Sequence, residues 1–318
     1  MISRSTGAAI AALLAAASLP PVSAQETSYP VTIQNGFNTF TVDAAPQRAI
    51  GVNLQNIELM LALGLEDRMA GVAYIPNYDN ILDRLMERVA NLPILAEQNL
   101  TLEVALGVEA DFIIGTNNSF VQNFADLDTL KGYGIAPMVP ESDSTPTSTM
   151  EEVYRDIRNL GIVFDVQPRA EALIAEIRAE MDAITDVVGT VADPVTVLQY
   201  NGSTDSVLTP FHDALPTNII SLAGGRNIFD DMPGRMGTVN MEEIVARNPD
   251  VIIVLANTPE EGEERIAFLE GNPALSTINA VQNDHYVVMS ITQLQGGVRN
   301  ANAVRALAEG FYPELFEE

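Results

Sequence analysis

Two segments of this 318-residue chain repeat each other, and the repeat constrains the fold more than any other feature of the sequence. Residues 102–114 (LEVALGVEADFII) and 241–253 (MEEIVARNPDVII) align without a gap, so that Glu103 matches Glu242 and Asp111 matches Asp250. Each segment predicts a short helix, a turn that ends in aspartate, and an apolar strand. Apolar positions alone would match between many such units, but the matched acidic residues strengthen the case. The repeat therefore predicts two lobes of similar α/β build.

The segments that precede the first repeat predict a parallel sheet. Residues 31–33 and 37–42 alternate apolar and polar side chains around Asn35-Gly36, as in a β-hairpin. A short apolar strand at 49–52, a helix at 53–64 that ends at Gly64, and a second strand at 69–73 follow. Strands that alternate with helices in this way are typical of a parallel sheet covered by helices.

The longest helical pattern runs from Pro168 to Val188, a length of roughly 30 Å at the usual helical rise. Its apolar side chains are three and four residues apart: Ala170, Leu173, Ile174, Ile177, Met181, Ile184 and Val188. Such a helix is long enough to connect two lobes, although an ordinary surface helix would show the same amphipathic pattern. We therefore expect an N-terminal α/β lobe at 25–165, a linking helix at 166–190 and a C-terminal α/β lobe at 191–318.

The first 24 residues have the features of a cleaved signal peptide. Arg4 precedes a short apolar run at 7–19, and Val22-Ser23-Ala24 fits the small-residue rule for cleavage. A membrane anchor is the alternative, but the run is shorter than the roughly 20 apolar residues that a spanning helix needs. The chain contains no cysteine, which excludes disulfides, thiolate metal sites and a lipid-bearing cysteine.

The formal net charge of −27 argues against partners that are themselves polyanionic. An acidic surface of this strength repels nucleic acid and anionic membranes, so we expect neither nucleic-acid binding nor membrane insertion. Solubility, or a salty habitat, is one explanation of the charge, and a basic partner protein is another.

Several segments resemble the class III periplasmic solute-binding proteins, the receptors through which ABC importers take up ferric siderophores, vitamin B12 or haem. The resemblance covers nearly all of the chain after the signal peptide. Besides the two repeats, it rests on residues 45–52 (APQRAIGV), 61–72 (LALGLEDRMAGV), 221–228 (SLAGGRNI), 296–297 (GG) and 311–316 (FYPELF). The first repeat departs from the family pattern, because Ala110 stands where a proline usually precedes the aspartate. The family fold implies two Rossmann-like lobes bridged by one rigid helix, with a ligand between them.

The resemblance also implies permease-docking residues, one surface glutamate in each lobe. By motif position these are Glu103 and Glu242, the pair that the repeat itself matches. Equivalent carboxylates on two similar lobes suit a two-fold symmetric partner, which would be an ABC permease dimer with its ATPase subunits. A carboxylate that stabilises a helix start through the helix dipole is the alternative explanation.

Loops after the predicted strands hold the candidate ligand-binding residues, because ligands of such lobes bind beyond the carboxyl ends of parallel strands. Aromatic side chains would supply flat apolar contact, and arginines would pair with anionic oxygens of a chelate. The candidates are Tyr74, Tyr78, Asn117, Tyr200, His212, Arg235 and Arg299.

Other site chemistry has little support in the sequence. His212 and His285 are the two histidines, too few for a histidine-rich metal site, so we expect no resident metal or cofactor. A secreted α/β hydrolase is the competing enzyme hypothesis, but the chain has no Gly-x-Ser-x-Gly elbow. The sequence thus favours a monomeric, non-enzymatic periplasmic receptor that captures a metal chelate of the iron–siderophore type, with vitamin B12 or haem as alternatives.

Overall fold

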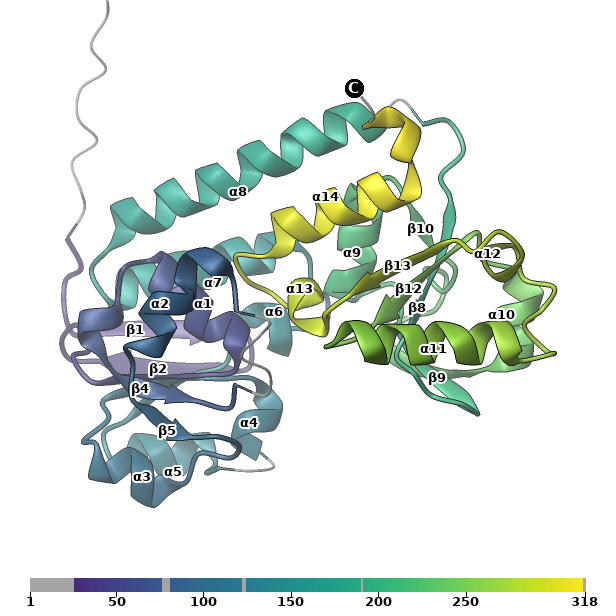
Figure 1. The fold of residues 1–318 in the computed structure, drawn as a ribbon. Helices are drawn as coiled ribbons and strands as arrows, with labels where there is room; N and C mark the ends of the chain where they lie inside the picture. Colours follow the sequence, from purple (N-terminus) through teal and green to yellow (C-terminus); the bar gives the residue numbers. More distant parts are fainter. Residues whose placement is uncertain (1–25, 76–80, 122–123, 190, 317–318) are drawn as a thin grey trace, which may run out of the picture.

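The computed structural model describes residues 26–75, 81–121, 124–189 and 191–316, and it contains two α/β lobes side by side (Figure 1). The predicted signal peptide at 1–24 and Tyr78 lie outside the described residues. No helix within the described ranges combines the length and the apolar character needed to cross a membrane.

The N-terminal lobe is built on a five-stranded parallel sheet with the order β5-β4-β3-β6-β7. Its strands are β3 (Ala49–Val52), β4 (Met69–Ala73), β5 (Ile94–Ala96), β6 (Phe112–Ile114) and β7 (Ala136–Met138). The predicted hairpin is present as β1 (Val31–Asn35) and β2 (Asn38–Val42), with Asn35 paired to Asn38. The helices of this lobe are α1 (Leu54–Ala62), α2 (Asp83–Ala90), α3 (Leu102–Gly107), α4 (Asn117–Val121), α5 (Leu127–Gly132), α6 (Glu141–Ser144) and α7 (Met150–Val163).

The C-terminal lobe holds a four-stranded parallel sheet with the order β10-β8-β12-β13, beside an antiparallel hairpin of β9 and β11. The strands are β8 (Thr196–Tyr200), β9 (Ser206–Pro210), β10 (Arg226–Asn227), β11 (Met236–Asn240), β12 (Val251–Leu255) and β13 (Tyr286–Met289). Its helices are α9 (Leu215–Leu222), α10 (Met241–Arg247), α11 (Pro259–Gly271), α12 (Asn279–Gln282), α13 (Ile291–Leu294) and α14 (Asn300–Phe311).

The repeated segments adopt the same local structure in both lobes. Thr101 caps α3 and Asn240 caps α10, each accepting a hydrogen bond from a backbone N–H three residues later. Both helices are followed by a residue with positive φ, Glu109 at 53° and Asn248 at 45°. The aspartate that follows, Asp111 or Asp250, then accepts hydrogen bonds from the backbone at the start of the neighbouring strand. The repeat is therefore a structural unit, and the prediction of two similar lobes is confirmed.

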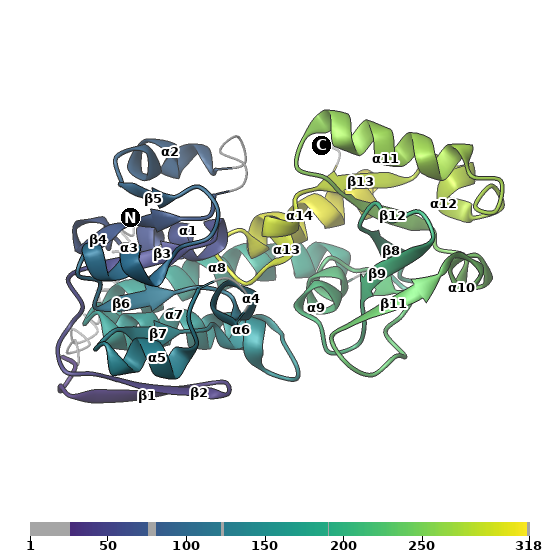
Figure 2. The same cartoon turned by 90° about the horizontal axis from the view of Figure 1, so that it is seen from below.

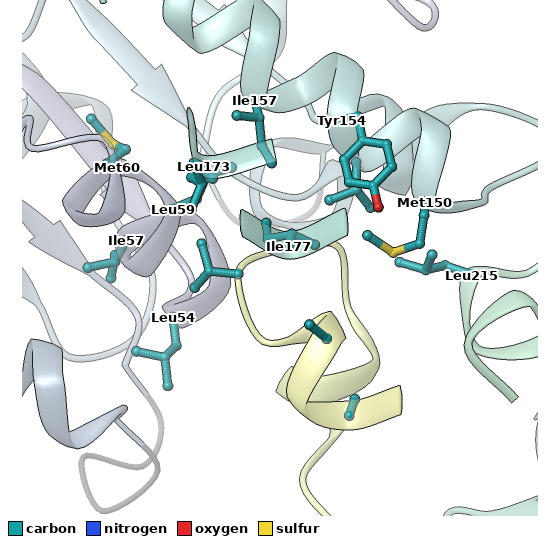
Figure 3. Packing of buried hydrophobic residues seen from close by; sticks show 14 of the residues in the cluster. Leu54, Ile57, Leu59, Met60, Met150, Tyr154, Ile157, Leu173, Ile177 and Leu215 are labelled. Carbon is teal, nitrogen blue, oxygen red and sulfur yellow. The ribbon is translucent and has the colours of Figure 1, made fainter. Parts of the chain in front are cut away.

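The predicted long helix is α8 (Gln167–Val188), which runs along both lobes with α14 beside it (Figure 1). Its apolar stripe is buried, from Ala170 to Val188. The hydrophobic cluster around it joins α1, α7 and α8 to Leu215 at the start of α9, so that it is continuous from one lobe to the other (Figure 3). A shared core of this kind resists wide separation of the lobes.

Candidate functional site

A cavity of about 320 Å³ lies at the carboxyl end of the N-terminal sheet. The strand order reverses between β3 and β6, and open α/β sheets bind ligands at such a switch point. Asn53 and Tyr74, which directly follow β3 and β4, contribute to its wall, as do Gln98, Asn99, Asn118, Phe124 and Gln295.

The turns after β3 and β4 each contain a residue with an uncommon backbone conformation. Asn53 has φ of 71° and Tyr74 has φ of 56°, a region that residues other than glycine seldom adopt. The Asn53 N–H donates to Ala73 O at 3.1 Å, and the Tyr74 N–H donates to Ala96 O at 3.0 Å. Strained conformations maintained by such contacts cluster at binding sites.

The side chain of Asn53 connects the turn after β3 to the segment after β6, the two strands that flank the switch point. Its Oδ1 atom accepts a hydrogen bond from Ser119 Oγ at 2.7 Å and one from the Thr116 N–H at 3.4 Å. Both donors belong to the segment that follows β6. The cavity wall is thus joined across β3 and β6.

A second cavity of about 200 Å³ lies between the lobes and shares Thr116 and Gln295 with the first. Gln55 and Ser142 line it from the N-terminal lobe, while Gln199 and Arg235 line it from the C-terminal lobe. A neighbouring cavity of about 300 Å³, which also contacts Gln199, continues along the C-terminal lobe. Together these cavities form the interlobe cleft, a term used below for this region.

The C-terminal wall of the interlobe cleft presents apolar side chains to solvent. Leu208 of β9, Met236 of β11 and Ile291 of α13 are 45%, 45% and 39% exposed, although all three line the same cavity. Exposed apolar groups gathered in a concave site suit a ligand with an apolar face.

A buried carboxylate holds the N-terminal wall in place. Asp156 of α7 accepts hydrogen bonds from the backbone N–H groups of Glu141 (2.6 Å) and Ser142 (3.0 Å), and from Asn35 Nδ2 (3.2 Å). Burial raises the pKa of Asp156 to about 7, although these hydrogen bonds act in the opposite direction. The side chain thereby fixes α6, which carries Ser142 into the cleft.

Of the predicted binding residues Tyr74 and Asn117, only the first lines the cleft. Tyr74 lines the first cavity, as expected. Asn117 does not line the cavities described above, because its N–H donates to Asp143 Oδ2 at 2.7 Å, and the next residue, Asn118, takes the cavity position.

Tyr200 and His212 are placed away from the cleft, contrary to the sequence-based expectation. Tyr200 is only 1% exposed, its ring stacks on Phe268, and its hydroxyl donates to Ser203 O. Successive side chains of a strand point to opposite faces, so the cleft instead receives Gln199 and Asn201. His212 is exposed, with Nδ1 2.9 Å from Asp230 O, and it lines none of the cavities described here.

Both predicted anion-binding arginines are used to join the lobes. Arg235 donates to the carbonyl oxygens of Ser142 (2.8 Å) and Thr145 (3.1 Å), across the interlobe cleft. Arg299 is 7% exposed and donates twice to the carboxylate of Glu58, at 2.6 Å each. The sequence could not predict these contacts, because they connect residues that are far apart in the chain.

Glu103 and Glu242 occupy equivalent exposed positions, each in the first turn of its helix. Figure 2 shows α3 in one lobe and α10 in the other, on either side of the region between the lobes. No group of three or more histidine, aspartate or glutamate side chains suited to hold a metal ion occurs within the described ranges.

Comparisons with known proteins agree with this architecture. A family model described as periplasmic binding protein matches residues 50–290. The chain is 23% identical over 294 residues to an uncharacterised ABC transporter substrate-binding lipoprotein of Bacillus subtilis, covering 91% of this chain and 88% of the relative. It is 26% identical over 227 residues to a vitamin B12-binding protein of Photorhabdus laumondii, covering 71% and 75%.

Solved structures share the fold. A periplasmic binding protein from Veillonella parvula superposes with a TM-score of 0.80 and 26% identity, over 87% of this chain and 94% of the other. A protein of an ABC-type Fe3+-hydroxamate transport system from Saccharomonospora viridis has a TM-score of 0.76 at 20% identity, over 89% and 99%. This second likeness concerns the fold alone.

Proposed function

Because this chain belongs to the periplasmic binding protein family, we propose that it is the substrate-binding component of an ABC importer and captures a metal chelate in its interlobe cleft. A ferric siderophore is the ligand type that we put first, and vitamin B12 or haem is the alternative. Relatives of the chain are solute-binding proteins, which are not enzymes, and this removes the hydrolase hypothesis.

One observation carries the proposal: the cavities open at the carboxyl ends of two separate parallel sheets that a single helix, α8, connects. A ligand in this position contacts both lobes at once. The shared hydrophobic core limits their relative motion, so that binding requires little reorganisation of the protein.

We further propose that residues 1–24 form a cleaved signal peptide and that the mature chain works as a monomer in the periplasm. Glu103 and Glu242 would then dock onto basic residues of the permease, one in each half of the dimer. Their exposure and their matched positions in α3 and α10 support this role.

Equilibrium binding of purified mature protein to a panel of ferric siderophores, cyanocobalamin and haemin tests the receptor function. We expect at least one chelate to bind with a Kd in the micromolar range or below, and bound ligand to stimulate the ATPase of the reconstituted importer. Failure of every chelate to bind, with a folded protein, would contradict the proposal.

A further inference from the structure

The cations of the interlobe cleft are already engaged within the protein. Arg235, which lines the cavity between the lobes, donates to two backbone carbonyls of the opposite lobe. Arg299, which lies outside the three cavities of the cleft, is buried against Glu58. Arg265, in the C-terminal cavity, forms an ion pair with Glu261 and donates to Leu255 O. The cavity at the switch point of the N-terminal lobe has no charged residue among its described lining.

Carboxamide side chains take the place of charge in this region. Asn53, Gln98, Asn99, Asn118 and Gln295 line the first cavity. Gln98, Asn99 and Asn118 are exposed, and no hydrogen bond to another described residue engages the side-chain amide of these three or of Gln295. A carboxamide offers two N–H donors and a carbonyl acceptor, so it complements another amide closely and an anion only through its N–H groups.

Gln199 provides an independent indication of a ligand. It is 1% exposed, it lines both interlobe cavities, and its Oε1 atom has no hydrogen-bond partner among the described residues. A buried acceptor left unpaired is unfavourable, and such atoms in native proteins call for a partner. A ligand N–H group placed in the cleft would supply that partner.

We propose that the ligand carries no net charge and bears amide groups at its periphery. This inference rests on the proposed receptor function and narrows its ligand class. A multiply charged anion would lose its hydration in a cleft whose cations are committed elsewhere, a loss that neutral amides would not offset. An amide-bearing ligand instead pairs with the carboxamides of the first cavity and with Gln199, while its apolar face covers Met236 and Ile291.

Isothermal titration of the mature protein with four chelates tests the ligand class. Cyanocobalamin and the ferric trihydroxamate ferrichrome carry no net charge and are rich in amides, whereas haemin and a trianionic ferric tris-catecholate are anionic. We expect at least one uncharged ligand to bind at least 100-fold more tightly than either anion, with an affinity that changes less than about twofold between low and high salt.

The outcomes separate the two proposals. Tighter binding of an anionic chelate would overturn the ligand class and leave the receptor function standing. Binding of no chelate at all would overturn both.

Gln199→Leu tests the pairing atom directly, with Gln34→Leu on the exposed face of β1 as the matched control. We expect the first variant to lose about tenfold in affinity for the uncharged ligand, the scale of one hydrogen bond. Its unliganded melting temperature should equal or exceed that of the parent, because an unpaired buried acceptor is removed. Unchanged affinity in a folded Gln199→Leu protein would overturn the role of Gln199 and with it the inference.

Discussion

The carboxylate of Glu58 and the guanidinium of Arg299 form a doubly hydrogen-bonded ion pair, 241 residues apart in sequence, that joins α1 of one lobe to the start of α14 in the other. Their side chains are 0% and 8% exposed, and Glu58 also accepts a hydrogen bond from the Leu82 N–H. A buried charge pair therefore links the two lobes at their junction.

Glu58→Gln should destabilise the protein by about 3–5 kcal/mol, because it leaves the arginine charge buried without its carboxylate. Chemical denaturation measures the change. The exposed pair of Glu171 and Arg158 supplies the control, since Glu171→Gln should lower the free energy of unfolding by less than about 1 kcal/mol. Equal effects of the two variants would show that the Glu58–Arg299 pair has no special role.

Protonation of Asp156 should make the free energy of unfolding depend on pH. Its pKa is about 7 in the folded protein against an ordinary value of 3.8, so the folded state binds the proton more tightly. The stabilisation is complete below the lower value and is lost as the pH rises through about 7, a total on the order of 4 kcal/mol.

Urea denaturation at several pH values between 3.8 and about 7 measures this dependence. The free energy of unfolding should fall less steeply with rising pH for Asp156→Asn than for the parent. Asp186→Asn, which removes an exposed carboxylate of α8, should keep the parental slope. The same slope in all three proteins would contradict the assignment to Asp156.

Gly225→Ala should lower the free energy of unfolding by about 1–3 kcal/mol through overpacking. A Cβ atom at this position would lie 2.7 Å from Phe311 Cε2 of α14 and 3.0 Å from Val197 Cγ2 of β8. Gly107→Ala is the matched control, because a Cβ there meets nothing within 4 Å and should slightly favour α3. Thermal or urea denaturation distinguishes the two variants. An unchanged free energy of unfolding in Gly225→Ala would refute close packing at Gly225.

Removing both docking candidates should separate ligand binding from transport. The Glu103→Ala and Glu242→Ala double variant should bind ligand within about twofold of the parent, since both residues lie in exposed first turns outside the cavities. Ligand-dependent stimulation of the reconstituted importer's ATPase should fall by tenfold or more if these carboxylates orient the complex.

A double variant that removes two exposed carboxylates of α8, Glu176→Ala and Glu180→Ala, controls for net charge. Full stimulation by the Glu103 and Glu242 double variant would leave these residues with only a helix-start role.

The sequence predicted the local units well, because their causes are local. The repeated helix, turn and aspartate follow from capping and backbone chemistry within a few residues, and α8 follows from its apolar spacing. The short strand β5 and the hairpin of β9 and β11 were missed, because their patterns are brief and their pairing partners are distant.

What the sequence by itself determined was the pair of α/β lobes, the helix that connects them and the matched Glu103 and Glu242. Only the tertiary structure decided which side chains face the cleft: Gln199 rather than Tyr200, and Asn118 rather than Asn117. It also assigned Arg235 and Arg299 to the junction of the lobes. The physical reason is that helix and strand patterns depend on neighbours in the chain, whereas the direction of a side chain and the partner of a charge depend on which surfaces meet in space.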